Sequence, residues 1–401
     1  MKRGSADLPL HYGTVPQWLA QRMCLLGGAI AEAIVMEYGR SALLQRLSDP
    51  FWFQSLGCVL GMDWHSSGIT TSVMNALKKA INRRSGELGV YVCGGRGKAS
   101  RQTPAELLDI AGKTGLNGNE LVRSSRLSAK VDNTALQDGF QLYLHSFIVT
   151  IDGEWAVIQQ GMNTEEKMAR RYHWLSSALP SFTEEPHASV CGVNRGMILN
   201  LTAKEALPAK EGIMQLTAMS PGKLLREVSL ILPRRHEVTA ADVDMKRLGA
   251  TLVLAHERGV ANIEELLLLE GLGPRTLQSL TLTSEIIHGT PSRFSDPARF
   301  SFAHGGKDGH PFPVPLRVYD QTVETFDKAI RLARLGDRDK SDALKNLSKI
   351  SLEMEKGYTP GDYFERLLQH ERDSSWQHGG KTVYGDARKP SEKAVQLRLW
   401  E

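Results

Sequence analysis

The chain has 401 residues, which is more than one ordinary domain needs and predicts two or three domains. Hydrophobic residues make up 41% of it and charged residues 23%, values that exclude a largely disordered chain, a collagen-like repeat and a coiled-coil rod. The 49 Lys and Arg exceed the 45 Asp and Glu by only four, so the net charge permits nucleic-acid binding without requiring it.

No apolar run reaches the ~20 residues that a membrane-spanning helix needs, and no apolar segment follows the basic N-terminus as in a signal peptide. The four cysteines are widely spaced and form no C-x-x-C pair, which excludes a zinc site built on cysteine ligands. We therefore expect reduced thiols in a cytoplasmic protein that does not enter a membrane.

The first half of the chain alternates between helical and strand-like patterns. Apolar spacing predicts helices over residues 14–47 and 70–81, and a capping box at Thr103–Glu106 begins another helix that runs to about residue 111. The apolar runs 56–62 and 88–93 read as buried strands. This order predicts an N-terminal α/β unit.

From about residue 139 the apolar residues recur with a different spacing. Segments 141–149 and 155–160 flank Asp152–Gly153, which is a hairpin signature, and a helix is predicted over 164–172. Residues 218–292 and 319–370 read as helical.

These patterns predict a mixed α+β fold in three parts. Residues 1–215 form an α/β, nuclease-like catalytic domain, and residues 216–370 form a mostly helical domain with a glycine-rich loop at 302–314. Residues 371–401 form a polar, flexible tail.

Residues 261–288 have the pattern of a helix–hairpin–helix, in which a glycine turn joins two apolar helices. The glycines allow a tight turn and close approach of backbone to a ligand, and free N–H groups at the second helix's start favour phosphate. Leu272 is expected to pack between the helices. The alternative is a plain helical hairpin. The predicted phosphate-binding residues are Gly271, Gly273, Arg275 and Thr276.

A basic segment supports the same interpretation. Residues 83–130 hold nine Lys and Arg against four Asp and Glu, a net charge of +5. Phosphate neutralisation by such residues gives affinity that does not depend on base sequence, and Arg96 and Lys98 are the predicted contacts. A solvated basic face is the alternative. The Gly94–Lys98 turn lacks the spacing of a nucleotide P-loop.

Polar residues of catalytic type lie at predicted strand ends and around the hairpin. Such residues hold divalent metals and activate water in phosphodiester hydrolysis. They are Asp63, His65, Lys130, Asp132, Asp138, His145 and Gln160, with Asp63, Asp132 and Asp138 as ligands of Mg²⁺ or Mn²⁺.

The arrangement of carboxylates before a hairpin resembles the PD-(D/E)xK nuclease core, although Gln160 stands where that core has Lys. Each residue also has a structural alternative. Asp63 can cap a helix, and His145 can be a hydrogen-bonded core residue.

Four blocks resemble one family, the domain-of-unknown-function 763 family. The blocks are Gly61–Thr71, Gln159–Asn163, Arg171–Leu175 and Phe302–Val314. The resemblance spans roughly residues 8–370 and implies little about the activity of the protein.

The residues therefore predict a metal-dependent nuclease that acts on DNA, with RNA as a further candidate substrate. A non-enzymatic DNA-binding or repair-scaffold protein is the alternative. A third reading is a phosphate-ester enzyme that uses the Gly305–His310 loop, in which Lys307 would contact phosphate.

Overall fold

A computed structural model describes residues 8–9, 15–62, 67–220, 222, 245–298, 316–333, 335–355, 381–382 and 385–386. Contacts group the chain into two compact units, residues 1–356 and 357–401. The second unit contains an antiparallel pair of short strands, β10 (Lys381–Thr382) and β11 (Gly385–Asp386). The predicted boundary at residue 215 falls inside a helix of the first unit, and the three-part division stays a prediction.

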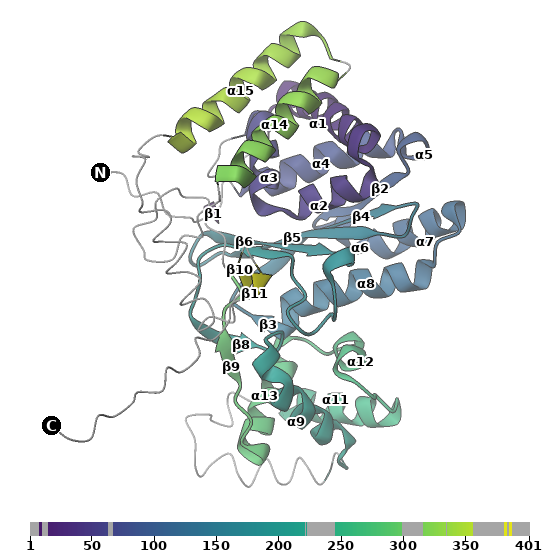
Figure 1. The fold of residues 1–401 in the computed structure, drawn as a ribbon. Coiled ribbons are helices and arrows are strands. Elements are labelled where there is room, and N and C mark those ends of the chain that lie inside the picture. The colour runs from purple at the N-terminus through teal and green to yellow at the C-terminus, as the bar shows by residue number, and fades with distance from the viewer. Residues whose placement is uncertain are drawn as a thin grey trace, which may run out of the picture. The chain divides into compact units, whose positions relative to one another are not determined.

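An antiparallel sheet lies at the centre of the first unit (Figure 1). Its strands are paired in the order β1-β6-β5-β4-β2, and β7 pairs with β6 beside β1. Their bounds are β1 (Leu8–Pro9), β2 (Val90–Arg96), β4 (Gln141–Thr150), β5 (Trp155–Asn163), β6 (Met168–Leu175) and β7 (Ser189–Cys191).

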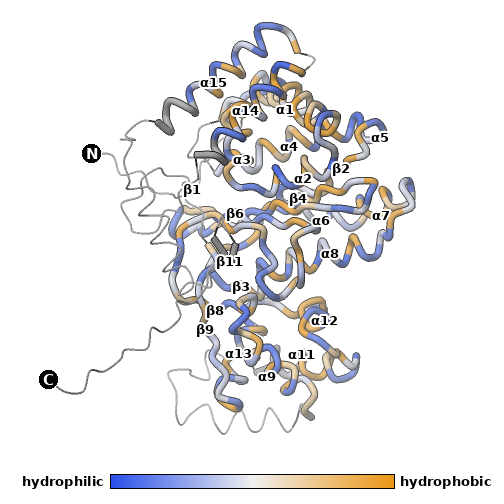
Figure 2. The backbone as a smooth tube through the Cα atoms, viewed as in Figure 1, coloured by the Kyte–Doolittle hydropathy of each residue, from blue (hydrophilic) through white to orange (hydrophobic). Residues whose placement is uncertain are grey.

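One face of this sheet is covered by a layer of helices (Figure 1). A single apolar core, which includes Ile30, Phe53 and Leu77, joins these helices to the inner strands. In Figure 2, hydrophobic residues are concentrated along α1 and the strands beneath it. The helices of this layer are α1 (Gln17–Tyr38), α2 (Arg40–Ser48), α3 (Pro50–Val59), α4 (Gly68–Asn82), α5 (Ser85–Leu88), α14 (Leu316–Leu332) and α15 (Asp337–Glu355).

The opposite face packs against helices and a smaller antiparallel sheet of order β3-β8-β9. Its strands are β3 (Leu136–Gln137), β8 (Met197–Asn200) and β9 (Arg293–Ser295). The helices on this side are α6 (Lys98–Arg101), α7 (Thr103–Thr114), α8 (Gly118–Lys130), the π-helix η1 (Val131–Ala135), α9 (Leu207–Ala218), α11 (Met245–Glu257), α12 (Ile263–Leu268) and α13 (Pro274–His288). Two 3₁₀ turns, η2 (Ser176–Ala178) and η3 (Lys204–Ala206), join these elements.

The mixed α+β fold, the β4–β5 hairpin and the helices near 70–81 and 103–111 are confirmed. The strand predicted over 56–62 is wrong, because those residues begin inside α3. Asp49 caps this helix by accepting a hydrogen bond from the Trp52 N–H (2.7 Å), and Pro50 suits its first turn. Every residue of α3 is buried, so its apolar residues do not show the 3.6-residue spacing that would distinguish a helix from a strand.

The helix predicted over 164–172 is also wrong, because the chain forms β6 from Met168. Alternate residues of β6 point to opposite faces of the sheet. Arg170 and Tyr172 bond to Asp138 on one side, while Arg171 bonds to Gln54 on the other.

One helix among the described residues, α1, is long and apolar enough to cross a membrane by length and composition alone. Its inner residues Met23, Ile30 and Ile34 are buried in the core against α4, whereas Trp18, Leu25 and Met36 are exposed. The predicted absence of a membrane partner stays a prediction. All four cysteines are free thiols, and three of them are buried.

Candidate nucleic-acid interface

The α12–α13 hairpin, residues 263–288, has two helices joined by a glycine turn. Asn262 caps α12 by accepting from the Glu265 N–H (3.0 Å), and Gly271 has a φ of +81°, which favours glycine. Gly273 precedes α13, and Pro274 occupies its first turn. Leu272 is only 2% exposed and belongs to one core with Leu266 and Leu277, while its predicted position between the two helices stays a prediction.

Three side chains from the region of α8 and β3 hold this hairpin. The Lys130 Nζ donates to the Leu272 carbonyl (2.6 Å), and the Gln137 Nε2 donates to the Pro274 carbonyl (2.8 Å). Arg123 forms an ion pair with Glu264 at the start of α12 (2.5 Å). The turn is therefore fixed on both sides by groups more than 130 residues away in sequence.

Backbone N–H groups at this turn remain available for an acceptor. Within the described part of the chain, the N–H groups of Gly271 and Gly273 make no hydrogen bond. That of Arg275 lies in the first turn of α13, where a helix offers no internal acceptor. The predicted contact Thr276 is only 1% exposed, so its N–H is not open to a ligand. Gly271 and Arg275 are exposed, and the positive end of the helix dipole lies here. The geometry suits an anion.

A second basic group lies where β2 ends and α6 begins. Arg96, Lys98 and Arg101 are exposed, and none of them forms an ion pair with a described carboxylate. Arg96 also lies over the Tyr143 ring at 5.9 Å. We call these three residues the basic turn.

Three other cations of the segment 83–130, Arg84, Lys113 and Arg123, are paired with carboxylates. Arg84 pairs with Glu32 and Glu87, and Lys113 pairs with Asp109. The net charge of that segment therefore overstates the positive charge that a phosphate meets.

The predicted residues Asp132 and His145 come together in a buried chain of hydrogen bonds through Gln159. The Gln159 Nε2 donates to Asp132 Oδ2 (2.5 Å), while Gln159 Oε1 contacts His145 Nδ1 (2.9 Å). The Trp174 indole also donates to Asp132 Oδ2, and His187 bonds to Oδ1 at 2.5 Å. Both oxygens of Asp132 are thus occupied inside the protein.

His145 continues this chain to Ser125, whose hydroxyl lies 2.9 Å from the ring Nε2. Because Gln159 Oε1 only accepts, Nδ1 carries the proton and Nε2 accepts from Ser125. Burial lowers the pKa of His145, although Gln159 and Asp132 act in the opposite direction. A neutral, fully bonded core histidine is the structural alternative that the sequence left open, and this geometry fits it.

Asp138 belongs to a different buried cluster. Its Oδ2 accepts from the Arg170 guanidinium (2.9 Å) and the Tyr172 hydroxyl (2.6 Å), and its Oδ1 accepts from the Phe140 N–H. Arg170 also binds Asp296 (2.8 Å), and all three charged side chains have no exposed surface or almost none. Burial alone would lower the pKa of Arg170, but Asp138 and Asp296 raise it above its ordinary value.

Gln160 lies apart from both carboxylates. Its Nε2 donates to the Ser67 carbonyl (3.0 Å) and to the Tyr143 hydroxyl (2.7 Å). Its Oε1 is buried and has no hydrogen-bond partner in the described structure. Burial raises the pKa of Tyr143, so its hydroxyl stays protonated at neutral pH.

The predicted metal centre has no counterpart among the described residues, where no three His, Cys, Asp or Glu side chains are placed to hold an ion. Asp63 and His65 lie outside the described residues, as do Lys307 and the rest of the loop 302–314. Lys130 contacts the α12–α13 hairpin rather than Asp132, and burial lowers its pKa.

Sequence reasoning missed several members of these clusters, namely Ser125, Arg170, His187 and Asp296. Arg170 alternates with Tyr172 and Trp174 along β6, and a period of two over residues 168–175 would have placed these three on one face. His187 and Asp296 lie in irregular segments where no period operates.

No curated protein and no solved structure matches this chain. A family described as a protein of unknown function, DUF763, matches residues 4–314. The match covers more than three quarters of the sequence and includes the β6 clusters and the α12–α13 hairpin. The chain therefore belongs to the DUF763 family.

Proposed function

We propose that this protein binds DNA through the phosphate backbone, without preference for base sequence, at the α12–α13 hairpin. The single observation that carries this proposal is the set of available N–H groups at an exposed, anchored helix start. An anion there meets several donors and the positive end of α13 at once. RNA, whose backbone has the same charge, is a second ligand of the same surface.

The Arg275 side chain and the basic turn add positive charge, which strengthens backbone binding and makes it depend on salt. Such contacts position a protein on a duplex but read no sequence. Binding should therefore be similar for oligonucleotides of different sequence and should weaken as salt rises.

Gly273 offers a selective test because a Cβ there meets no atom within 4 Å and its φ of −127° suits any residue. Replacing Gly273 with Leu should cover the N–H groups and weaken DNA binding about tenfold, equivalent to about 1.4 kcal/mol. Fluorescence anisotropy with labelled duplexes measures this change.

The matched control is Gly336→Leu, because Gly336 also precedes a helix, α15, and also has open space at its Cβ position. This variant should bind DNA like the wild type. Equal affinity of a folded Gly273→Leu variant and the wild type would remove the hairpin from the DNA-binding surface.

Metal-dependent cleavage of DNA is the second candidate function. One observation favours it, the buried Gln160 Oε1 without a described partner next to Ser67, because an unsatisfied buried acceptor costs about 1–3 kcal/mol. Amide oxygen is a ligand that Mg²⁺ and Mn²⁺ accept, and the candidates Asp63 and His65 precede Ser67 closely in sequence.

Incubation of labelled single- and double-stranded DNA and RNA with Mg²⁺, Mn²⁺ or EDTA tests this candidate. If the protein is a nuclease, EDTA should stop cleavage, and Asp63→Asn and Gln160→Leu should each lower the rate by at least about a hundredfold. Asp132→Asn serves as the comparison, since its oxygens are occupied by internal donors. If neither metal stimulates cleavage of any of these substrates, the cleavage proposal fails and only the binding proposal remains.

A further inference from the structure

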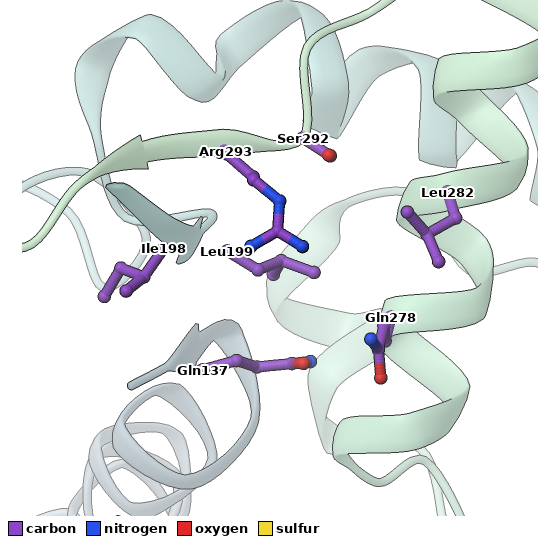
Figure 3. Close-up of a pocket in the computed structure, with 7 residues that line it drawn as sticks. All are labelled: Gln137, Ile198, Leu199, Gln278, Leu282, Ser292 and Arg293. Atoms are coloured by element: carbon purple, nitrogen blue, oxygen red, sulfur yellow. The ribbon is translucent and has the colours of Figure 1, made fainter. Parts of the chain in front are cut away.

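A small cavity lies beside the α12–α13 hairpin, between α13 and the three-stranded sheet. It has a volume of about 130 Å³ and is lined by residues from β3, β8, β9 and α13 (Figure 3). The lining residues are Gln137, Ile198, Leu199, Gln278, Leu282, Ser292 and Arg293.

The size and the apolar part of the wall suit one flat ring. Leu199 and Leu282 face the cavity from β8 and from α13 (Figure 3). An engineered apolar cavity of about 150 Å³ in another protein is known to hold benzene, so about 130 Å³ is enough for a six-membered ring and small for a fused pair. A pyrimidine base therefore fits the space better than a purine does.

The polar part of the wall has donors and acceptors with no internal partner. In the described structure, no hydrogen bond or ion pair is made by the side chains of Gln278, Ser292 or Arg293. Gln137 uses its Nε2 on the Thr134 and Pro274 carbonyls, which leaves its Oε1 as an acceptor.

Amide side chains carry a donor and an acceptor side by side, and this pattern complements the edge of a nucleobase. The Arg293 guanidinium reaches across the cavity in Figure 3 and can hold a phosphate or lie against a ring.

The cavity is connected to the proposed phosphate site through α13 and β3. Gln278 follows Pro274 by four residues, one helical turn or about 6 Å. Gln137 lines the cavity and also bonds to the Pro274 carbonyl. A nucleotide whose phosphate lies at the start of α13 therefore has this cavity within reach of its base.

We propose that the cavity receives an unpaired pyrimidine base of a DNA strand whose backbone is held by the α12–α13 hairpin. This inference rests on the proposed function. It adds a preference for single-stranded or frayed DNA, because a base must leave its partner to enter. Gln278 is a specificity residue, and Arg293 binds the same nucleotide.

The experiment measures the affinity of the full-length protein for different oligonucleotides of equal length and charge. Oligo-dT should bind about tenfold more tightly than an oligonucleotide of abasic tetrahydrofuran units, and oligo-dA should bind like the abasic strand. Gln278→Leu should bring the dT-to-abasic ratio to about one while leaving abasic binding unchanged. Arg293→Ala should lower dT binding, whereas Arg338→Ala, which removes an exposed charge on α15, should not.

Equal wild-type affinity for dT and abasic strands would overturn the inference, and so would a Gln278→Leu variant that keeps the preference. Thymidine monophosphate, followed by NMR, separates this failure from failure of the proposed function. If DNA does not bind but the mononucleotide does, and Gln278→Leu abolishes that binding, the cavity stands and the hairpin proposal falls. If the mononucleotide and both strands fail to bind, both proposals fall.

Discussion

At the scale of single residues, two buried histidines make the fold sensitive to acid. The His173 Nδ1 donates to the Leu47 carbonyl (3.0 Å), and its Nε2 accepts from Arg171 Nε (2.9 Å), so the ring is neutral. Burial, and then the charge of Arg171, hold the pKa of His173 well below its ordinary value. Burial lowers the pKa of His145 as well.

A histidine with a lowered pKa in the folded state stabilises the fold above its unfolded pKa of about 6.5 and loses that contribution as pH falls below it. We expect the free energy of unfolding to fall between pH 6.5 and 5.5 by up to about 1.4 kcal/mol per pH unit for each histidine. Urea titrations over this range should show a shallower pH slope for His173→Asn, which removes one titrating ring. Parallel curves for the variant and the wild type would contradict this assignment.

Arg170 is the residue whose loss should cost most, because Asp138 and Asp296 would then share a buried site without their cation. We expect Arg170→Met to lower the free energy of unfolding by about 3–5 kcal/mol. Arg195 is a close control, since it also lies over the Phe140 ring but pairs with Glu166 in partial contact with solvent. Arg195→Met should cost less than about 1 kcal/mol in the same denaturant titration. Similar losses in the two variants would exclude a special role for the buried cation.

At the scale of elements, α3 and α4 approach each other closely at Gly57. A Cβ on Gly57 would lie 2.5 Å from the Cγ2 of Ile69, an atom next to the α4 backbone. Alanine is favoured over glycine inside a helix by about 1 kcal/mol, but overpacking a core costs about 1–3 kcal/mol. Gly57→Ala should therefore lower the melting temperature. Gly112→Ala in α7, where nothing lies within 4 Å, should raise it. A rise in both variants would show that α3 can move away from α4.

Elements with a clear period were predictable from the sequence. The β4–β5 hairpin has two strand-like segments on either side of an Asp-Gly turn, and α4 and α7 have helical spacing. Buried segments without a period were not. Every residue of α3 is buried, and β6 carries large polar residues on both faces, so each lost the signal that distinguishes helix from strand.

At the scale of the whole molecule, the candidate interface was predictable only where its residues are close together in sequence. The glycine turn and the start of α13 are contained in a few residues, and Leu272 between them is buried. The cavity joins Gln137, Leu199, Gln278 and Arg293, which are far apart in sequence, so only the folded chain could reveal it. The same holds for the pairing of Asp138 with Arg170 and Asp296.

The anchoring of the turn by Lys130 and Gln137 has an electronic consequence. Each peptide unit joins the carbonyl of one residue to the N–H of the next, and a hydrogen bond accepted at the carbonyl polarises that N–H. Lys130 acts on the Leu272 carbonyl and thereby on the Gly273 N–H, and Gln137 acts on the Pro274 carbonyl and thereby on the Arg275 N–H. Two side chains behind the turn, Lys130 and Gln137, thus make the backbone amides of Gly273 and Arg275 stronger hydrogen-bond donors.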